Sequence, residues 1–123
     1  MIKGLFFVFV GGGLGSVIRF LIGRSWNQNI PLGTFAVNVI GSLLIGLAMG
    51  YFLREGTSQN NIHLLFVAGF CGGFTTFSAF AIENYLFLKN GDILHFATYA
   101  LLSLAVGIMA VILGVFLSKF IPS

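Results

Sequence analysis

The sequence predicts an all-α membrane protein with four transmembrane helices, and three observations support this fold class. Hydrophobic residues make up 58% of the 123 positions. Charged residues make up only 7%, whereas an ordinary soluble domain has about 25%. Four long apolar runs follow one another, separated by short polar connections. A chain with this composition has a lipid bilayer as its main solvent.

Each apolar run is long enough to cross a bilayer. A helix rises about 1.5 Å per residue and the hydrocarbon layer is about 30 Å thick, so about 20 apolar residues suffice. The predicted spans are residues 4–23, 32–53, 62–88 and 93–121, which together form a single transmembrane domain over residues 1–123. The first run is longer than the apolar part of a secretory signal, so we expect it to be a retained helix.

The charged residues give little information about orientation. Lys3, Arg54 and Lys119 fall on one predicted side of the membrane. Arg24 and Lys89 fall on the other, where Arg19 is a third basic residue if it reaches the interface. A clear excess of basic residues normally marks the cytoplasmic side. Either the bias is merely weak, or the chain inserts in both directions and pairs as an antiparallel dimer. The basic residues stand singly, as membrane-boundary anchors do, and predict no nucleic-acid partner.

The second span carries small and polar residues along one face, spaced by four: Thr34, Asn38, Ser42, Gly46 and Gly50. Small residues at this spacing allow close packing between membrane helices, which is the simplest explanation for the glycines. An amide inside the membrane must find partners, and Asn38 can also donate hydrogen bonds to a permeating species.

The third span contains paired glycines, hydroxyl residues and aromatic residues between positions 69 and 80. A straight helix over 62–88 would be about 40 Å long, so we expect an interruption in mid-membrane. Non-helical backbone at this depth has to be buried in protein or line a polar cavity. Free carbonyls there can bind a hard cation and free amides an anion. A simple glycine kink that serves packing is the alternative.

Four other side chains in the spans invite a functional interpretation. Phe77 and Phe80 share a helix face, and their positive ring edges can stabilise a bare anion, although core packing is the alternative. Glu83 is an intramembrane carboxylate, which allows a cation-coupled role. Arg19 either extends to the membrane interface or draws anions into a vestibule.

Enzymatic chemistry is not expected. His63 and His95 have no neighbours at metal-ligand spacing, and no phosphate-binding loop or Ser/His/Asp set is present. Cys71 is the only cysteine and cannot form an internal disulfide bond.

The sequence GGFTTFSAF at residues 72–80 resembles the signature of the Fluc (CrcB) fluoride channels. The segments GGLGSVIRF at 12–20 and GTFAVNVIGS at 33–42 agree with the same family, in the expected order. The resemblance covers the whole chain. Two positions depart from it, because Ala79 stands where family members often carry a hydroxyl residue, and Gly107 lacks a side-chain donor that some relatives have.

The resemblance implies an antiparallel dual-topology homodimer with two separate narrow pores. It implies a structural Na⁺ on the two-fold axis, held by the backbone carbonyls of Gly72 and Thr75. It also implies vestibule residues, Arg19 and Glu83, and a set of pore-lining residues: Phe77, Phe80, Asn38, Ser78, Thr76, Tyr99 and Ser103.

The expected function is therefore a passive, fluoride-selective channel in the inner (plasma) membrane of a bacterium. Its partners are the fluoride ion, a second copy of the chain and the lipid bilayer. The alternative is a proton-coupled exporter of the small multidrug resistance type, although that class has a carboxylate in its first helix, where this chain has only Arg19. A third possibility is a non-transporting scaffold, which would leave the interrupted third span without a purpose.

Overall fold

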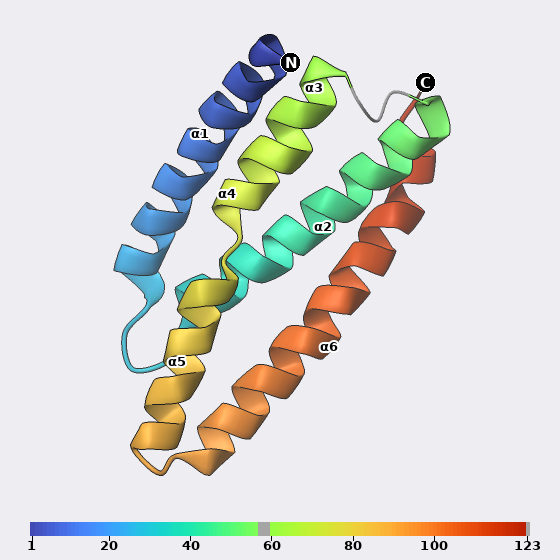
Figure 1. Ribbon diagram of the computed structural model, residues 1–123. Coiled ribbons are helices and arrows are strands. Elements are labelled where there is room, and N and C mark those ends of the chain that lie inside the picture. Colours follow the sequence, from blue (N-terminus) through green and yellow to red (C-terminus); the bar gives the residue numbers. More distant parts are fainter. Residues whose placement is uncertain (57–59, 123) are drawn as a thin grey trace.

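The computed structural model describes residues 1–56 and 60–122, which fold into helices joined by short connections (Figure 1). In chain order the elements are α1 (Ile2–Trp26), α2 (Leu32–Glu55), α3 (Asn61–His63), the π-helical segment η1 (Leu64–Cys71), α4 (Gly72–Phe74), α5 (Phe77–Lys89), α6 (Ile93–Leu117) and the 3-10 turn η2 (Ser118–Phe120).

Four helical stretches of the described chain are long and apolar enough to cross a membrane: Ile2–Trp26, Leu32–Glu55, Asn61–Lys89 and Ile93–Phe120. The predicted all-helical fold with four apolar spans is confirmed. The observed ends lie within a few residues of the predicted ones. The first span begins and ends slightly outside residues 4–23, because the helix continues through the polar residues at each end.

The helices pack in two pairs. α1 lies along η1 and α4, and α2 lies along α6. α5 continues below α4 and contacts the beginning of α6, near the connection between α1 and α2 (Figure 1). The N-terminus, the end of α2, the beginning of α3 and the turn η2 lie at the same end of the molecule (Figure 1).

Glycines allow the paired helices to approach backbone to backbone. A Cβ atom on Gly11 would overlap the carbonyl oxygen of Leu65 in η1, and one on Gly73 would overlap that of Gly12 in α1. The same holds between α2 and α6, where Gly46 and Gly114 face each other's backbone. Lipid provides no hydrophobic drive for helix association, so such close contacts supply the packing energy. The interpretation of the glycines in the second span as packing positions agrees with the contacts of Gly46.

The ends of two helices follow from local chemistry. α2 ends at Gly56, whose φ of 70° lies in the left-handed region that glycine adopts without strain. α6 begins after Asp92, whose side chain accepts a hydrogen bond from the backbone N–H of His95. These ends place the connections outside the apolar spans.

Candidate functional site

The helix that forms the third span is interrupted at Thr75 and Thr76. α4 ends at Phe74 and α5 begins at Phe77, and both threonines have extended backbone conformations. Thr75 turns its hydroxyl back to the carbonyl of Cys71 at 2.9 Å, and its N–H donates to the same oxygen at 3.1 Å. The depth of this interruption in the bilayer stays a prediction.

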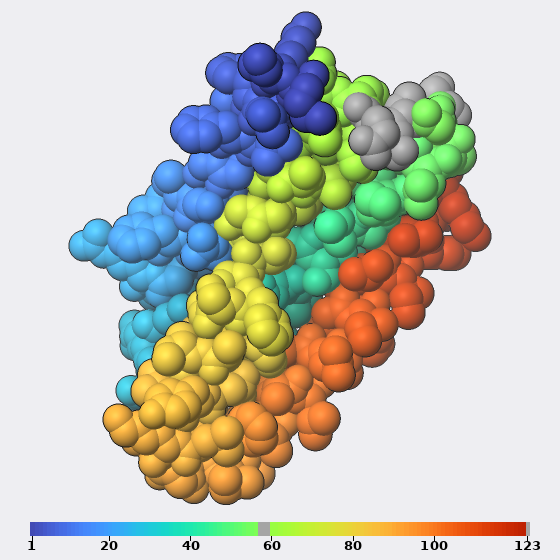
Figure 2. All heavy atoms as spheres, in the orientation of Figure 1, coloured from blue at the N-terminus to red at the C-terminus, as the bar shows by residue number. Residues whose placement is uncertain are grey.

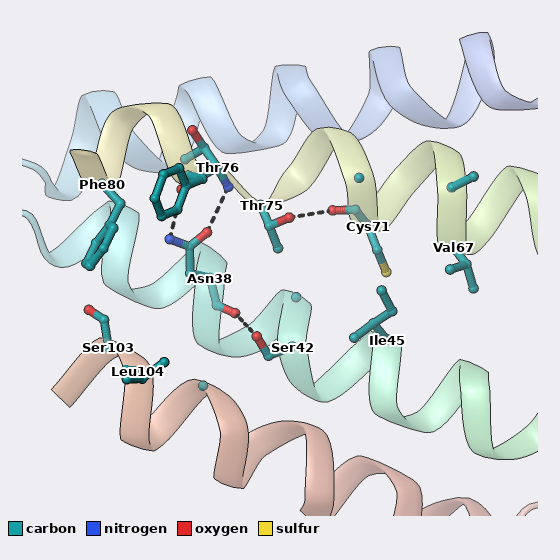
Figure 3. Close-up of a pocket in the computed structure, with 15 residues that line it drawn as sticks. Asn38, Ser42, Ile45, Val67, Cys71, Thr75, Thr76, Phe80, Ser103 and Leu104 are labelled. Atoms are coloured by element: carbon teal, nitrogen blue, oxygen red, sulfur yellow. Dashed lines mark hydrogen bonds between the residues drawn. The ribbon is translucent and has the colours of Figure 1, made fainter. Parts of the chain in front are cut away.

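Asn38 fastens the interruption to α2 through the backbone of Thr76. Its Nδ2 donates to the Thr76 carbonyl at 3.0 Å, and its Oδ1 accepts from the Thr76 N–H at 2.8 Å (Figure 3). The amide therefore satisfies two backbone groups that the broken helix leaves without partners. One of its two N–H bonds remains available, because the amide has a second hydrogen.

Next to the interruption, the backbone carbonyls of Gly72, Phe74 and Thr75 accept no hydrogen bond from the part of the chain that the structure describes. The carbonyl of Gly73 accepts from Arg19 Nε at 2.9 Å. Phe74 is buried, whereas Gly72 is exposed and Thr75 is half-buried. Free carbonyls are the ligands that a hard cation prefers, so the oxygens of Gly72 and Thr75 fit a Na⁺ ion. The described residues contain no group of three His, Cys, Asp or Glu side chains able to hold a metal.

A groove of about 570 Å³ runs beside the interruption. In Figure 2, atoms of α2 are visible between the segment around α4 and α6. The groove is open along one side of the single chain, and its lining comes from α2, η1, α4, α5 and α6: Asn38, Gly41, Ser42, Ile45, Val67, Ala68, Cys71, Gly72, Thr75, Thr76, Phe77, Phe80, Ser103, Leu104 and Gly107.

Aromatic rings form one end of the groove. Phe77 and Phe80 lie with their ring centroids 5.9 Å apart, and Phe80 contacts Tyr99 of α6 at 5.1 Å. Phe80 points toward the space beside Asn38 and Ser103 (Figure 3). Phe77 is 78% exposed in the single chain. Phe80 is therefore fixed by its packing against Tyr99, whereas the exposed surface of Phe77 is free to contact a second protein chain or lipid.

The hydroxyl residues Thr76 and Ser103 line the same groove, whereas Ser78 and Tyr99 are not among its lining residues. Thr76 Oγ1 accepts from the Ala79 N–H at 3.1 Å and lies 3.2 Å from Ser78 Oγ. Ser103 Oγ is buried in the groove wall without a hydrogen-bond partner among the described residues. An unpartnered buried hydroxyl retains a proton that it can donate to a ligand.

Glu83 accepts a hydrogen bond on each of its carboxyl oxygens. Tyr99 Oη donates to Oε1 at 2.7 Å, and Thr34 Oγ1 lies 2.5 Å from Oε2. Thr34 in turn contacts Asn27, which follows α1. The sequence predicts Thr34 only as part of a small-residue face, and Asn27 is not among the predicted site residues. One feature of the sequence points to a residue such as Asn27. Pro31, which precedes α2, has no side-chain acceptor, so the free N–H groups of the first turn need an acceptor from elsewhere.

Arg19 turns toward the interruption. Its Nε bonds to the Gly73 carbonyl, and its side chain lines a cavity of about 400 Å³ together with Arg24, Asn27 and Thr34. Extension of Arg19 to the membrane interface does not by itself account for its bond to Gly73. Its role as a vestibule residue stays a prediction, as do the roles of the pore-lining residues.

Comparisons with known proteins identify relatives of the whole chain. The family model described as CrcB-like protein, Camphor Resistance (CrcB), matches residues 6–115. A protein of Gloeothece citriformis named fluoride-specific ion channel FluC is 47% identical over 91% of this chain and 94% of its own length. A protein of the same name from Phocaeicola vulgatus is 45% identical over 95% of this chain and 99% of its own length.

Proposed function

We propose, because this chain belongs to the CrcB family, that it is a fluoride channel through which the ion moves passively down its gradient. The relatives that carry the name fluoride-specific ion channel support the choice of ion. The chain is a multi-pass membrane protein with four apolar helices. A bacterial inner membrane is consistent with these relatives, and ion passage requires no enzymatic step.

The observation that carries the proposal is a groove with hydrogen-bond donors and ring edges but no fixed charge in its lining. Fluoride is small and strongly hydrated, so a pore must replace the lost water with donors. Ser103 has an unpartnered hydroxyl, and Asn38 keeps one free N–H. The positive edges of Phe77 and Phe80 add stabilisation without trapping the anion as a full charge would.

A second copy of the chain is proposed as the cover of this groove. Gly72 is exposed and Thr75 is half-buried, and their free carbonyls cannot face hydrocarbon because lipid offers no hydrogen bond. Phe77 is also exposed on this side. An antiparallel partner fits the nearly even distribution of basic residues. Each of the two copies would then contribute its own groove, giving two pores.

The carbonyls of Gly72 and Thr75, together with their counterparts in the second copy, are the proposed ligands of a structural Na⁺. A bound cation supplies positive charge that offsets the facing carbonyl dipoles. The residues of this chain orient those carbonyls. Thr75 is fixed by its bonds to Cys71, and Arg19 bonds to the Gly73 carbonyl, whereas the carbonyls of Gly72 and Thr75 remain free.

The proposal is tested by fluoride efflux from reconstituted liposomes, followed with a fluoride electrode. Phe77→Ile and Phe80→Ile are expected to reduce fluoride flux strongly while the protein remains folded. Phe9→Ile is the matched control, because Phe9 is exposed on α1, away from the groove. Chloride-loaded liposomes check selectivity. Normal flux in both groove variants would contradict the proposal.

A proton-coupled exporter is the alternative, and coupling separates the two. An exporter needs a proton gradient and loses activity in Glu83→Gln, whereas a channel conducts along a fluoride gradient alone. The family match favours the channel. Absence of any flux from folded, reconstituted protein would favour a scaffold instead.

A further inference from the structure

Asn27 holds Thr34 through both ends of its amide. The Thr34 N–H donates to Asn27 Oδ1 at 3.1 Å, and Asn27 Nδ2 donates to Thr34 Oγ1 at 3.0 Å. Thr34 lies in the first turn of α2, where backbone N–H groups have no partner within the helix. The residue before α2 is Pro31, which has no side-chain acceptor. Asn27 therefore caps α2 from outside the helix.

These contacts determine the direction of each hydrogen bond. A backbone N–H can only donate, so the amide atom facing it is the oxygen of Asn27. The other end is then the NH₂ group, which can only donate, so Thr34 Oγ1 accepts from it. A hydroxyl has one proton, and that of Thr34 is left for Glu83 Oε2 at 2.5 Å. Tyr99 supplies the second hydroxyl donor to Glu83.

The surroundings make this direction important for the charge on Glu83. In the ionised state a carboxylate can only accept hydrogen bonds, which suits two hydroxyl donors. Within the described residues, no Lys, Arg or His forms an ion pair with Glu83. Arg19 and Arg24 are the charged groups of the neighbouring cavity, on the side of Asn27 and Thr34. The hydroxyl donors are therefore the direct support of the negative charge.

We infer that Asn27 is a positioning residue that directs the Thr34 proton toward Glu83, so that each carboxyl oxygen of Glu83 accepts a hydroxyl hydrogen bond. Asn27 itself does not touch the permeating ion. The consequence for flux rests on the proposed function, because Glu83 is a proposed vestibule residue. The consequence for stability rests on the hydrogen bonds alone.

Reversal of the hydrogen-bond chain is the first test. In Asn27→Asp the new carboxylate requires the Thr34 proton, so Thr34 presents a lone pair to Glu83. In Glu83→Gln the amide cannot accept from both Thr34 and Tyr99. In the double variant every group is satisfied again, because Gln at 83 donates to Thr34 and Thr34 donates to Asp at 27.

Thermal unfolding of the purified protein measures this coupling. Each single substitution is expected to lower the midpoint, and the double variant is expected to unfold above both single variants. Losses that simply add in the double variant would overturn the inference. If Asn27→Asp gives no folded protein, recovery of folded protein in the double variant counts as the expected result, and its absence overturns the inference.

Fluoride efflux at different pH values is the second test. Asn27→Asp is expected to lower flux about tenfold at mildly alkaline pH, as loss of a hydrogen bond to a charged group implies. Flux should recover on acidification, because a protonated Asp at 27 can again donate to Thr34. Asn29→Asp is the control, since it adds the same charge at an exposed position of the same connection.

Equal pH profiles for Asn27→Asp and Asn29→Asp would contradict the inference, because charge alone would then explain the effect. Absence of fluoride flux in the unmodified protein would instead contradict the proposed function. The unfolding test would still decide the role of Asn27 in that case, since it requires no transport.

Discussion

Replacement of Gly41 by Ala is expected to separate α2 from the interruption at Thr75. A Cβ atom on Gly41 would overlap Thr75 Cγ2 and lie 3.3 Å from Phe74 Cδ2. Thr75 cannot rotate away without loss of its hydroxyl bond to Cys71 at 2.9 Å. The added methyl group therefore forces α2 to move.

This movement also strains the contact between Asn38 and Thr76. Asn38 lies on α2 one turn before Gly41, and its two bonds to Thr76 are 2.8 and 3.0 Å long. Overpacking costs about 1–3 kcal/mol, and each lost hydrogen bond about 0.5–1.5 kcal/mol, so we expect a total destabilisation of about 2–6 kcal/mol.

Two companion variants isolate the steric cause. Gly107→Ala is the control, since its Cβ would lie 3.8 Å from Ser42 Oγ, an ordinary contact in the same groove. Gly41→Ala combined with Thr75→Ser removes the conflicting methyl group and retains the hydroxyl bonded to Cys71. Unfolding of the purified protein and fluoride efflux should both recover in this double variant.

The reasoning would be refuted in either of two ways. Gly41→Ala could prove as stable as the unmodified protein, which would mean that α2 has room to move. Alternatively, addition of Thr75→Ser could fail to improve Gly41→Ala, which would mean that the Thr75 methyl group is not the obstacle.

Two further predictions concern charged side chains. Arg19→Ala should lower both fluoride flux and the unfolding midpoint, because the Gly73 carbonyl would keep only the Ser16 hydroxyl at 3.5 Å. Arg24→Ala removes the same charge from the same cavity and should affect stability less; equal effects would show that the Gly73 bond is unimportant. The hydrogen bond from His95 lowers the pKa of Asp92 below its ordinary 3.8. A lowered carboxyl pKa adds stability above the ordinary value, and this is lost as pH falls through the lowered one. The difference in unfolding midpoint between Asp92→Asn and the unmodified protein should therefore vanish on acidification, and a constant difference would contradict this assignment.

The sequence was sufficient to predict the helices and several features of the site. Apolar runs of bilayer length define the four spans, and the small residues spaced by four in the second span predicted the close approach at Gly46. Glycines and hydroxyl residues together indicated irregular backbone between positions 69 and 80, and Thr75 and Thr76 are extended there. These are local properties, because they depend on residues within a few turns of one another.

The sequence by itself determined that this chain forms four apolar helices and carries the motif of a fluoride channel family. Only the tertiary structure decided which polar groups meet: Asn38 with the Thr76 backbone, Arg19 with the Gly73 carbonyl, and Glu83 with Thr34. Contacts between separate helices depend on how each helix is rotated and shifted along its neighbour. Local periodicity restricts a residue to a face of its own helix, and packing against the other helices selects its partner.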